Sequence, residues 1–94
     1  MYIIRDVFNT KPGKARDLVS KFKKAAPAMK KAGFKVRVMT DAVATYWTVV
    51  LEIEVSDIPA YFENIRVRIP EVDKAMQGYM ELVNGGYREI FKVE

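Results

Sequence analysis

The residues from Tyr46 to Val55 alternate between two kinds of side chain, and this alternation constrains the fold more than any other feature of the sequence. Period two is the repeat of a β-strand, whose successive side chains point to opposite faces. One set is mixed, whereas the other is apolar throughout and consists of Trp47, Val49, Leu51, Ile53 and Val55. The pattern therefore predicts a strand over 46–55 whose apolar face, Trp47 included, packs into a core.

Three further strands are predicted from the same kind of evidence. Residues 34–41 alternate apolar and polar side chains, and so do residues 87–93. The segment 2–9 is rich in Ile, Val and aromatic residues and contains no Gly or Pro. Gly85 and Gly86 are predicted to form the turn that precedes the last strand.

Two helical regions separate these strands. Apolar residues spaced three and four apart predict a helix over 15–32, ended by Gly33. Pro27 lies inside it, and we expect a kink or a broken turn near Lys23 because proline lacks the N–H that would bond there. A second region begins near Ile58, restarts at Pro70 and repeats at helical spacing up to Val83.

The order strand, helix, strand, strand, helix, strand is that of the split βαβ, or ferredoxin-like, fold. Right-handed crossovers place both helices on one face of a four-stranded antiparallel sheet, which makes the class α+β. At 94 residues the chain is too short for two separate cores, so we expect one domain over 1–94.

The second face of this sheet is left uncovered, and its residues are too apolar to be well solvated. Arg37, Glu52 and Glu54 lie there among apolar residues that we predict to be Phe8 or Val7, Met39, Tyr46, Val50 and Phe91. Covering the face with a second copy of the same sheet also adds the burial that a small chain lacks. The sequence therefore predicts a homodimer.

The amino-acid composition excludes several kinds of chemistry. The chain contains no Cys and no His, so it has no disulfide, thiol nucleophile or imidazole, and we expect neither a metal site nor a cofactor. No apolar run is long enough to span a membrane, and residues 1–6 lack the order of a signal peptide. We expect a cytoplasmic protein with no membrane partner.

Charge is divided unevenly along the chain. Residues 1–41 carry eleven Lys and Arg against three Asp and Glu, whereas residues 42–94 carry five against nine. The helix over 15–32 therefore has a Lys-rich outer face. No aromatic residues are interleaved with these lysines, so we do not expect a nucleic-acid partner.

The chain resembles the dimeric α/β-barrel superfamily, and within it the NIPSNAP-like and antibiotic-biosynthesis-monooxygenase-like proteins. The resemblance is carried by the turn at 11–14, by Leu18 and Phe22 of the following helix, and by residues 47–52 running into 56–58. It implies two sheets packed face to face with a ligand cavity in each protomer. Some members are cofactor-independent oxygenases or isomerases; others bind haem through a His that this chain lacks.

Asp6 is the first candidate for a functional residue, because the first strand lies near the centre of the sheet. A carboxylate on a covered face has a raised pKa unless a cation pairs with it. Arg37 is the candidate cation, and Glu52 on a neighbouring strand completes a polar cluster. In it Asp6 or Glu52 acts as a base toward an acidic phenol or enol, and Arg37 stabilises the anion.

Two readings of this cluster stay open. Asp6, Arg37 and Glu52 can bind a ligand together with Phe8 and Tyr46, or they can form a structural salt-bridge network across the dimer. If Arg5 rather than Asp6 points into the cavity, the site favours an anionic ligand.

Two functions follow from the sequence. The first is a dimer that holds a small aromatic or conjugated molecule in a sheet-lined cavity, as a binding protein or as a cofactor-independent monooxygenase or isomerase. The alternative is a non-catalytic dimeric module whose partner binds the basic helix face. The salt dependence of binding distinguishes the two functions, because charge-driven binding weakens as ionic strength rises.

Overall fold

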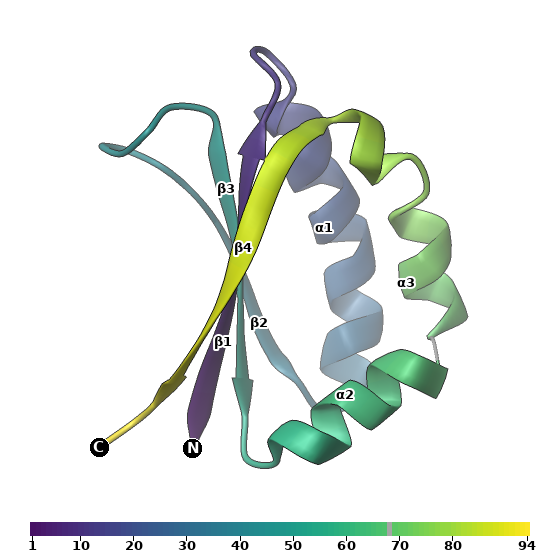
Figure 1. Cartoon of the computed structure of the whole chain (residues 1–94). Coiled ribbons are helices and arrows are strands. Elements are labelled where there is room, and N and C mark those ends of the chain that lie inside the picture. The colour runs from purple at the N-terminus through teal and green to yellow at the C-terminus, as the bar shows by residue number, and fades with distance from the viewer. Residues whose placement is uncertain (68) are drawn as a thin grey trace.

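The structure is a computed structural model that describes residues 1–67 and 69–94, with the backbone alone for residues 65–67. Over these ranges the chain forms four strands, three α-helices and one short 3₁₀ helix (Figure 1). In chain order they are β1 (Tyr2–Thr10), α1 (Ala15–Lys31), β2 (Lys35–Thr40), β3 (Thr48–Val55), α2 (Ile58–Val67), α3 (Pro70–Ala75), η1 (Tyr79–Glu81) and β4 (Val83–Lys92).

The strands form one antiparallel sheet in the order β2-β3-β1-β4, so β1 lies between β3 and β4. The helices all lie on one face of this sheet (Figure 1). The loop between β2 and β3 projects from one end of the sheet, on the side away from the helices. The predicted ferredoxin-like α+β arrangement is confirmed.

The alternation of β1 decides which side chains face the helices. Ile4 is fully buried in the core, and Phe8 packs against Phe22 of α1 with ring centroids 5.5 Å apart. Because the side-chain repeat of a strand is two residues, Asp6 lies on this covered face and Arg5 lies on the open one. The strand thus places opposite charges back to back.

The core lies between the covered face and α1. Val49, Leu51 and Ile53 of β3 share the buried face that their alternation predicts. Each large apolar side chain that is removed from water contributes roughly 1.5–3 kcal/mol. α1 supplies the opposite wall with Leu18, Phe22, Ala25 and Met29, whose spacing places them along one side of the helix.

α1 runs without interruption from Ala15 to Lys31, so the prediction that Pro27 breaks it near Lys23 is wrong. Pro27 lies on the exposed side of the helix, while buried residues before and after it hold both halves against the sheet. Gly33 ends the helix as predicted, with a left-handed φ of 99°.

The second helical region is divided at Pro70, as predicted, but it ends earlier than Val83. Asp57 caps α2, accepting a hydrogen bond at its Oδ1 from the backbone N–H of Ala60 at 3.1 Å. α3 stops at Ala75, and Gly78 then takes a left-handed φ of 79° before η1. A helix cannot continue through such a residue, so β4 begins where the apolar spacing still suggested helix.

The connection between β2 and β3 is longer than the sequence suggests. Tyr46 and Trp47 have φ of 63° and 54°, and strand pairing begins only at Thr48. The Trp47 carbonyl accepts hydrogen bonds from the Thr10 N–H at 2.8 Å and from its hydroxyl at 2.9 Å. Trp47 is therefore outside the strand and 45% exposed, so its predicted place in the core is wrong.

Gly85 and Gly86 belong to β4 and do not form the predicted turn. Gly86 lies opposite Phe8 of β1, and a Cβ added to it would be 2.5 Å from the Val7 carbonyl oxygen. Glycine is needed at this position because the two backbones approach too closely for a side chain.

We expect Gly86→Ala to destabilise the fold by about 1–3 kcal/mol, because β4 must move away from β1 to admit the methyl group. Gly85→Ala is the matched control, since no atom lies within 4 Å of its added Cβ. Urea unfolding measures both changes. Equal destabilisation by the two substitutions would contradict the close approach.

Candidate functional site

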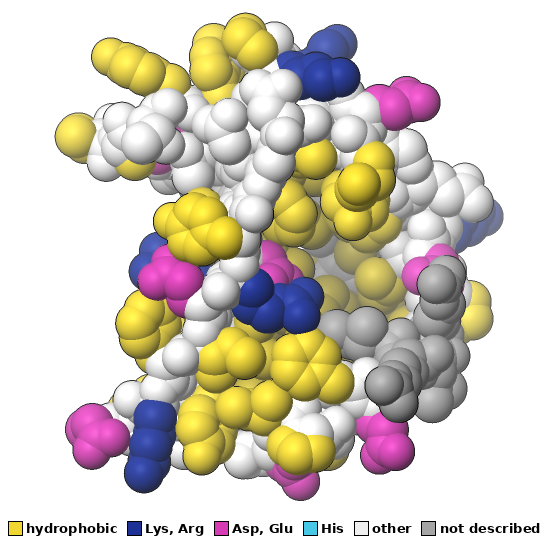
Figure 2. Space-filling view, in the orientation of Figure 1, with side chains coloured by type: hydrophobic (Ala, Val, Ile, Leu, Met, Phe, Trp, Pro, Cys, Tyr) yellow, Lys and Arg dark blue, Asp and Glu magenta, His cyan; other side chains and the backbone are white. Residues whose placement is uncertain are grey.

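A cavity of about 250 Å³ lies between the covered face of the sheet and the helices. Figure 2 shows apolar side chains gathered around a hollow between β4 and the helical layer. Most of the lining is apolar, and it comes from β1, α1, α3 and the residue after α3: Phe8, Phe22, Met29, Val72 and Met76. A few polar groups interrupt it, which is the usual composition of a small-molecule site.

Charged residues of the lining are Asp73 of α3 and an ion pair between Asp6 and Arg88. The two residues of the pair are directly opposite each other on β1 and β4. Arg88 Nε donates to Asp6 Oδ1 at 2.5 Å, and an Nη atom donates to Oδ2 at 3.4 Å. The hydrogen bond with Asp6 raises the pKa of Arg88, against the opposing effect of burial. The Asp6 side chain is 13% exposed and that of Arg88 44%.

Tyr61 of α2 is another polar group of the cavity. Its side chain is 2% exposed, and burial together with the negative charge of Asp6 raises the pKa of Tyr61 to about 12. The hydroxyl is therefore protonated at neutral pH and is available as a hydrogen-bond donor.

Aromatic rings hold these groups in place. Tyr61 makes edge contacts with Phe34 and Phe62, each with centroids 5.3 Å apart. The Arg88 guanidinium lies over the Phe62 ring, with its Cζ atom 5.2 Å from the centroid. A guanidinium held between a carboxylate and an aromatic ring has few accessible rotamers, so it is positioned before a ligand arrives.

The arrangement is suited to an acidic, conjugated molecule. Arg88 uses two of its five N–H groups on Asp6 and can offer others to a ligand oxygen. Tyr61 can donate to the same ligand, and the apolar walls favour a ring system over a flexible chain. A hydroxyl that loses its proton in this cavity has Asp6 as the nearby acceptor and Arg88 as the cation for the resulting anion.

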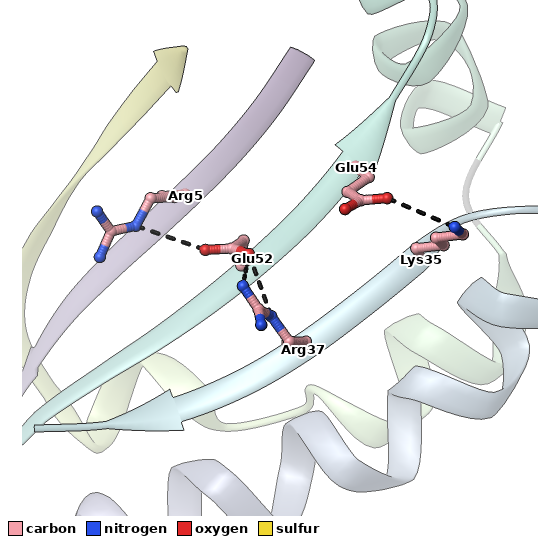
Figure 3. A network of polar contacts seen from close by, with 5 residues as sticks. All are labelled: Arg5, Lys35, Arg37, Glu52 and Glu54. Atoms are coloured by element: carbon pink, nitrogen blue, oxygen red, sulfur yellow. Dashed lines mark hydrogen bonds and ion pairs between the residues drawn. The ribbon is translucent and has the colours of Figure 1, made fainter. Parts of the chain in front are cut away.

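The structure does not bring the five sequence-predicted residues together. Asp6 and Phe8 line the cavity, whereas Arg37 and Glu52 lie on the open face (Figure 3). There Arg37 donates two hydrogen bonds to Glu52, which raise the pKa of Arg37. The predicted cluster of Asp6 with Arg37 and Glu52 is wrong, because the sheet separates its members.

Tyr46 lies in a third place, in the β2–β3 loop, where it is 78% exposed. It borders a larger hollow of about 540 Å³ beside the start of α1, which Trp47 and Arg16 also line. We assign the site to the smaller cavity, because that cavity contains a nearly buried charged group and the larger hollow is bordered by exposed side chains.

Arg88 and Tyr61 are the site residues that sequence reasoning missed. The alternation of residues 87–93 does separate Arg88 from Glu89, and the ferredoxin-like order does place the last strand beside the first. The missing information was the register between those strands, which pairs Arg88 with Asp6. Tyr61 carried only the signal of a core aromatic.

Within residues 1–67 and 69–94, no group of three or more acidic side chains could hold a metal ion, and no helix is long and apolar enough to cross a membrane. On α1, the lysines expected to form a basic outer face are exposed at positions 23, 24, 30 and 31.

Solved structures that are similar to this chain include NIPSNAP proteins. An uncharacterised NIPSNAP domain protein from Burkholderia xenovorans matches with a TM-score of 0.79 and 11% identity, covering 100% of this chain and 95% of its own. A NIPSNAP family protein from Agrobacterium tumefaciens matches with a TM-score of 0.78 and 8% identity, covering 99% and 92%.

A protein from Chloroflexus aurantiacus, provisionally assigned as an antibiotic biosynthesis monooxygenase, matches with a TM-score of 0.79 and 14% identity, covering 99% and 92%. No protein-family model and no curated protein matches the sequence. The neighbours confirm, at the level of the fold, the resemblance to NIPSNAP-like and monooxygenase-like proteins. At these identities the likeness concerns the fold and leaves activity open.

We expect stability to fall between pH 10 and pH 12 partly because of Tyr61. Its pKa is raised from 10.0 to about 12, so the folded state keeps the proton longer than the unfolded state does. The stabilisation is complete below pH 10 and is lost as pH rises toward 12. Tyr61→Phe should reduce this fall, while Tyr46→Phe at an exposed site should not. Urea unfolding at several pH values measures it, and identical profiles for wild type and Tyr61→Phe would contradict it.

Proposed function

We propose that the protein is a homodimer that binds a small conjugated organic acid in the cavity between its sheet and its helices. The observation that carries the proposal is the Asp6–Arg88 ion pair in an otherwise mostly apolar cavity. Burying charge beside apolar walls is unfavourable unless it is paired, and the exposed part of Arg88 leaves donors for a ligand. The predicted cytoplasmic location belongs to the same proposal.

The cavity volume limits the size of the ligand. An apolar cavity of about 150 Å³ accepts one benzene ring. A volume of about 250 Å³ therefore fits one ring with substituents or two fused rings. Phe8, Phe22 and Tyr79 provide aromatic surfaces against which such rings can pack.

A proton transfer is the simplest reaction that the site supports. The ligand hydroxyl gives its proton to Asp6, and Arg88 moves from that carboxylate to the enolate or phenolate oxygen. The exchange keeps the total charge of the cavity constant, so no charge is buried unpaired. An activated enolate is the starting point for the cofactor-independent monooxygenase or isomerase that the fold resemblance suggests.

The homodimer follows from the uncovered face of the sheet. The helices cover one face, and apolar side chains on the other remain exposed on β4, with Tyr87 at 62% and Phe91 at 47%. A 94-residue chain buries a small share of its surface, so a partner sheet adds stabilisation that the protomer lacks. We propose a second copy of the chain as the partner that covers this face, because most oligomers of soluble proteins are formed by identical chains.

Isothermal titration with hydroxylated naphthoquinones tests the ligand proposal. We expect binding that changes little between low and moderate salt, and that weakens about tenfold in Arg88→Gln because a charged donor is lost. Asp6→Asn/Arg88→Gln removes both charges and guards against a folding defect. Arg16→Gln, on the outer side of α1, is the control that keeps wild-type affinity.

Binding to Arg88→Gln with wild-type affinity, or no binding of any compound, would overturn the cavity assignment. Oxygen uptake during incubation in air tests the monooxygenase version separately. Binding without uptake or isomerised product leaves a binding protein. Binding that disappears at moderate salt instead supports an interaction through the basic face of α1.

Sedimentation equilibrium at micromolar concentration tests the homodimer. We expect a particle of twice 10.8 kDa that dissociates on dilution. The control is a Tyr87→Ser/Phe91→Ser variant, which should shift the equilibrium toward the monomer because it removes exposed apolar area from the open face. A monodisperse particle of 10.8 kDa for the wild type would contradict the dimer.

A further inference from the structure

A row of side chains with alternating charge crosses the open face from one edge of the sheet to the other. The strand register aligns Arg37 of β2, Glu52 of β3, Arg5 of β1 and Glu89 of β4. We call these four residues the charge row. Figure 3 shows Glu52 between the two arginines, with Arg37 hydrogen-bonded to it and Arg5 Nε 3.9 Å from its carboxylate.

Within one protomer, the charged groups of this row are not all paired. Among the described residues, Glu89 takes part in no ion pair, and the Nε atom of Arg5 is buried without a hydrogen-bond partner. The Arg37 side chain, at the other end, is 70% exposed. The two ends of the row are thus a cation and an anion that still have capacity for a partner.

The signs of the charge row make it complementary to its own reversed copy. Read from β2 to β4 the charges are plus, minus, plus, minus; read backward they are minus, plus, minus, plus. A two-fold axis parallel to the strands reverses the strand order and keeps each row at its own height. Arg37 then faces the partner's Glu89, and Arg5 faces the partner's Glu52.

The other face-to-face arrangement gives the opposite result. A two-fold axis perpendicular to the strands, within the plane between the sheets, places each strand over its own copy. When that axis lies at the height of the charge row, every residue of the row faces its own like charge, which costs stability at an interface. The row therefore distinguishes between two ways of stacking the same surfaces.

Exposed apolar residues on this side add area that a partner sheet can cover. Tyr87 is on β4, and Val43, 97% exposed, is in the loop between β2 and β3. Val43 and Tyr87 border one hollow of about 460 Å³ on the open face, together with Val7 and Val50. An axis parallel to the strands brings the β2 edge of each protomer to the β4 edge of its partner.

The geometry of packed sheets allows these contacts. Strands are about 4.8 Å apart, so the ends of a four-strand row lie about 7 Å from its centre. A rotation of about 30° between aligned sheets displaces those ends by about 4 Å. Arginine and glutamate side chains are long enough to span such an offset.

We propose that the charge row fixes the orientation of the homodimer, with the two-fold axis parallel to the strands and Arg37 of each protomer against the partner's Glu89. The inference rests on the proposed homodimer and adds its geometry. The partner is a second copy of this chain because the row is complementary to itself.

Cysteine cross-linking tests the orientation. The chain contains no cysteine, so each introduced cysteine is the only thiol that can react. Arg37→Cys and Glu89→Cys are prepared separately, mixed, and treated with a bis-maleimide of about 10 Å span, the distance between stacked sheets. We expect the 37–89 cross-link to dominate in the mixture, with little 37–37 product from Arg37→Cys alone. Peptide mapping by mass spectrometry identifies the linked positions.

Charge reversal tests whether the row contributes to affinity. Glu89→Arg places like charges at two symmetric positions. We expect the dissociation constant of the dimer to rise about tenfold or more at low salt, and by a smaller factor at high salt. Mixing Glu89→Arg with Arg37→Glu should restore association, because the two end pairs of the heterodimer again have opposite signs. Glu63→Arg makes the same charge change on α2 and should leave the dimer unaffected.

The outcomes separate this inference from the proposed function. A wild-type monomer removes the homodimer and the inference with it. A wild-type dimer that yields the 37–37 product, or that tolerates Glu89→Arg without loss of affinity, keeps the homodimer and overturns the orientation. Circular dichroism of each variant shows that altered association does not come from unfolding.

Discussion

Two neighbouring ionic residues in a central strand must point in opposite directions, and the architecture follows from how each one is neutralised. Arg5 and Asp6 are adjacent in β1, which has a strand on either side. Asp6 turns toward the helices and pairs with Arg88 from β4; Arg5 turns away and lies beside Glu52 from β3. A one-residue slip of β1 would exchange them and place both charges beside the wrong partners, so the register is strongly specified.

The cavity exists because the helical layer is not one continuous surface. α1 packs closely along the sheet, but the second helical region is divided at Pro70 into pieces that line the space with different residues. Tyr61 and Asn64 reach it from α2, Val72 reaches it from α3, and Met76 reaches it from just after α3. A single long helix would present one stripe of side chains and could not surround a polar group in the same way.

Periodicity predicted most of the fold, because periodicity reports which side of an element is buried. The buried faces of β3 and α1 are of this kind, whereas the arrangement of the sheet came from the crossover rule and the new start at Pro70 from the preference of proline for a first helical turn. The candidate site was predicted only in part. Asp6 and Phe8 do line the cavity, but Arg37 was assigned to them because no local pattern reveals which strand positions are opposite each other.

Where the sequence misled, tertiary contacts outweighed local preference. Gly86 resembles a turn residue in sequence, yet it is the small residue that a close approach of β4 to β1 requires. Tyr79, predicted as part of a helix, follows Gly78 in a 3₁₀ turn instead. The first case depends on a neighbour distant along the chain, and the second on the left-handed backbone of the adjacent Gly78.

The left-handed backbone at Tyr46 and Trp47 makes the β2–β3 loop dependent on its contacts with β1. Neither side chain prefers that conformation, which costs of order 1–2 kcal/mol per residue, and glycine would adopt it freely. Hydrogen bonds from Thr10 and Asn9 to the two carbonyls keep the shape. The loop therefore depends on β1 to hold two aromatic rings at the molecular surface, where Tyr46 is 78% and Trp47 45% exposed.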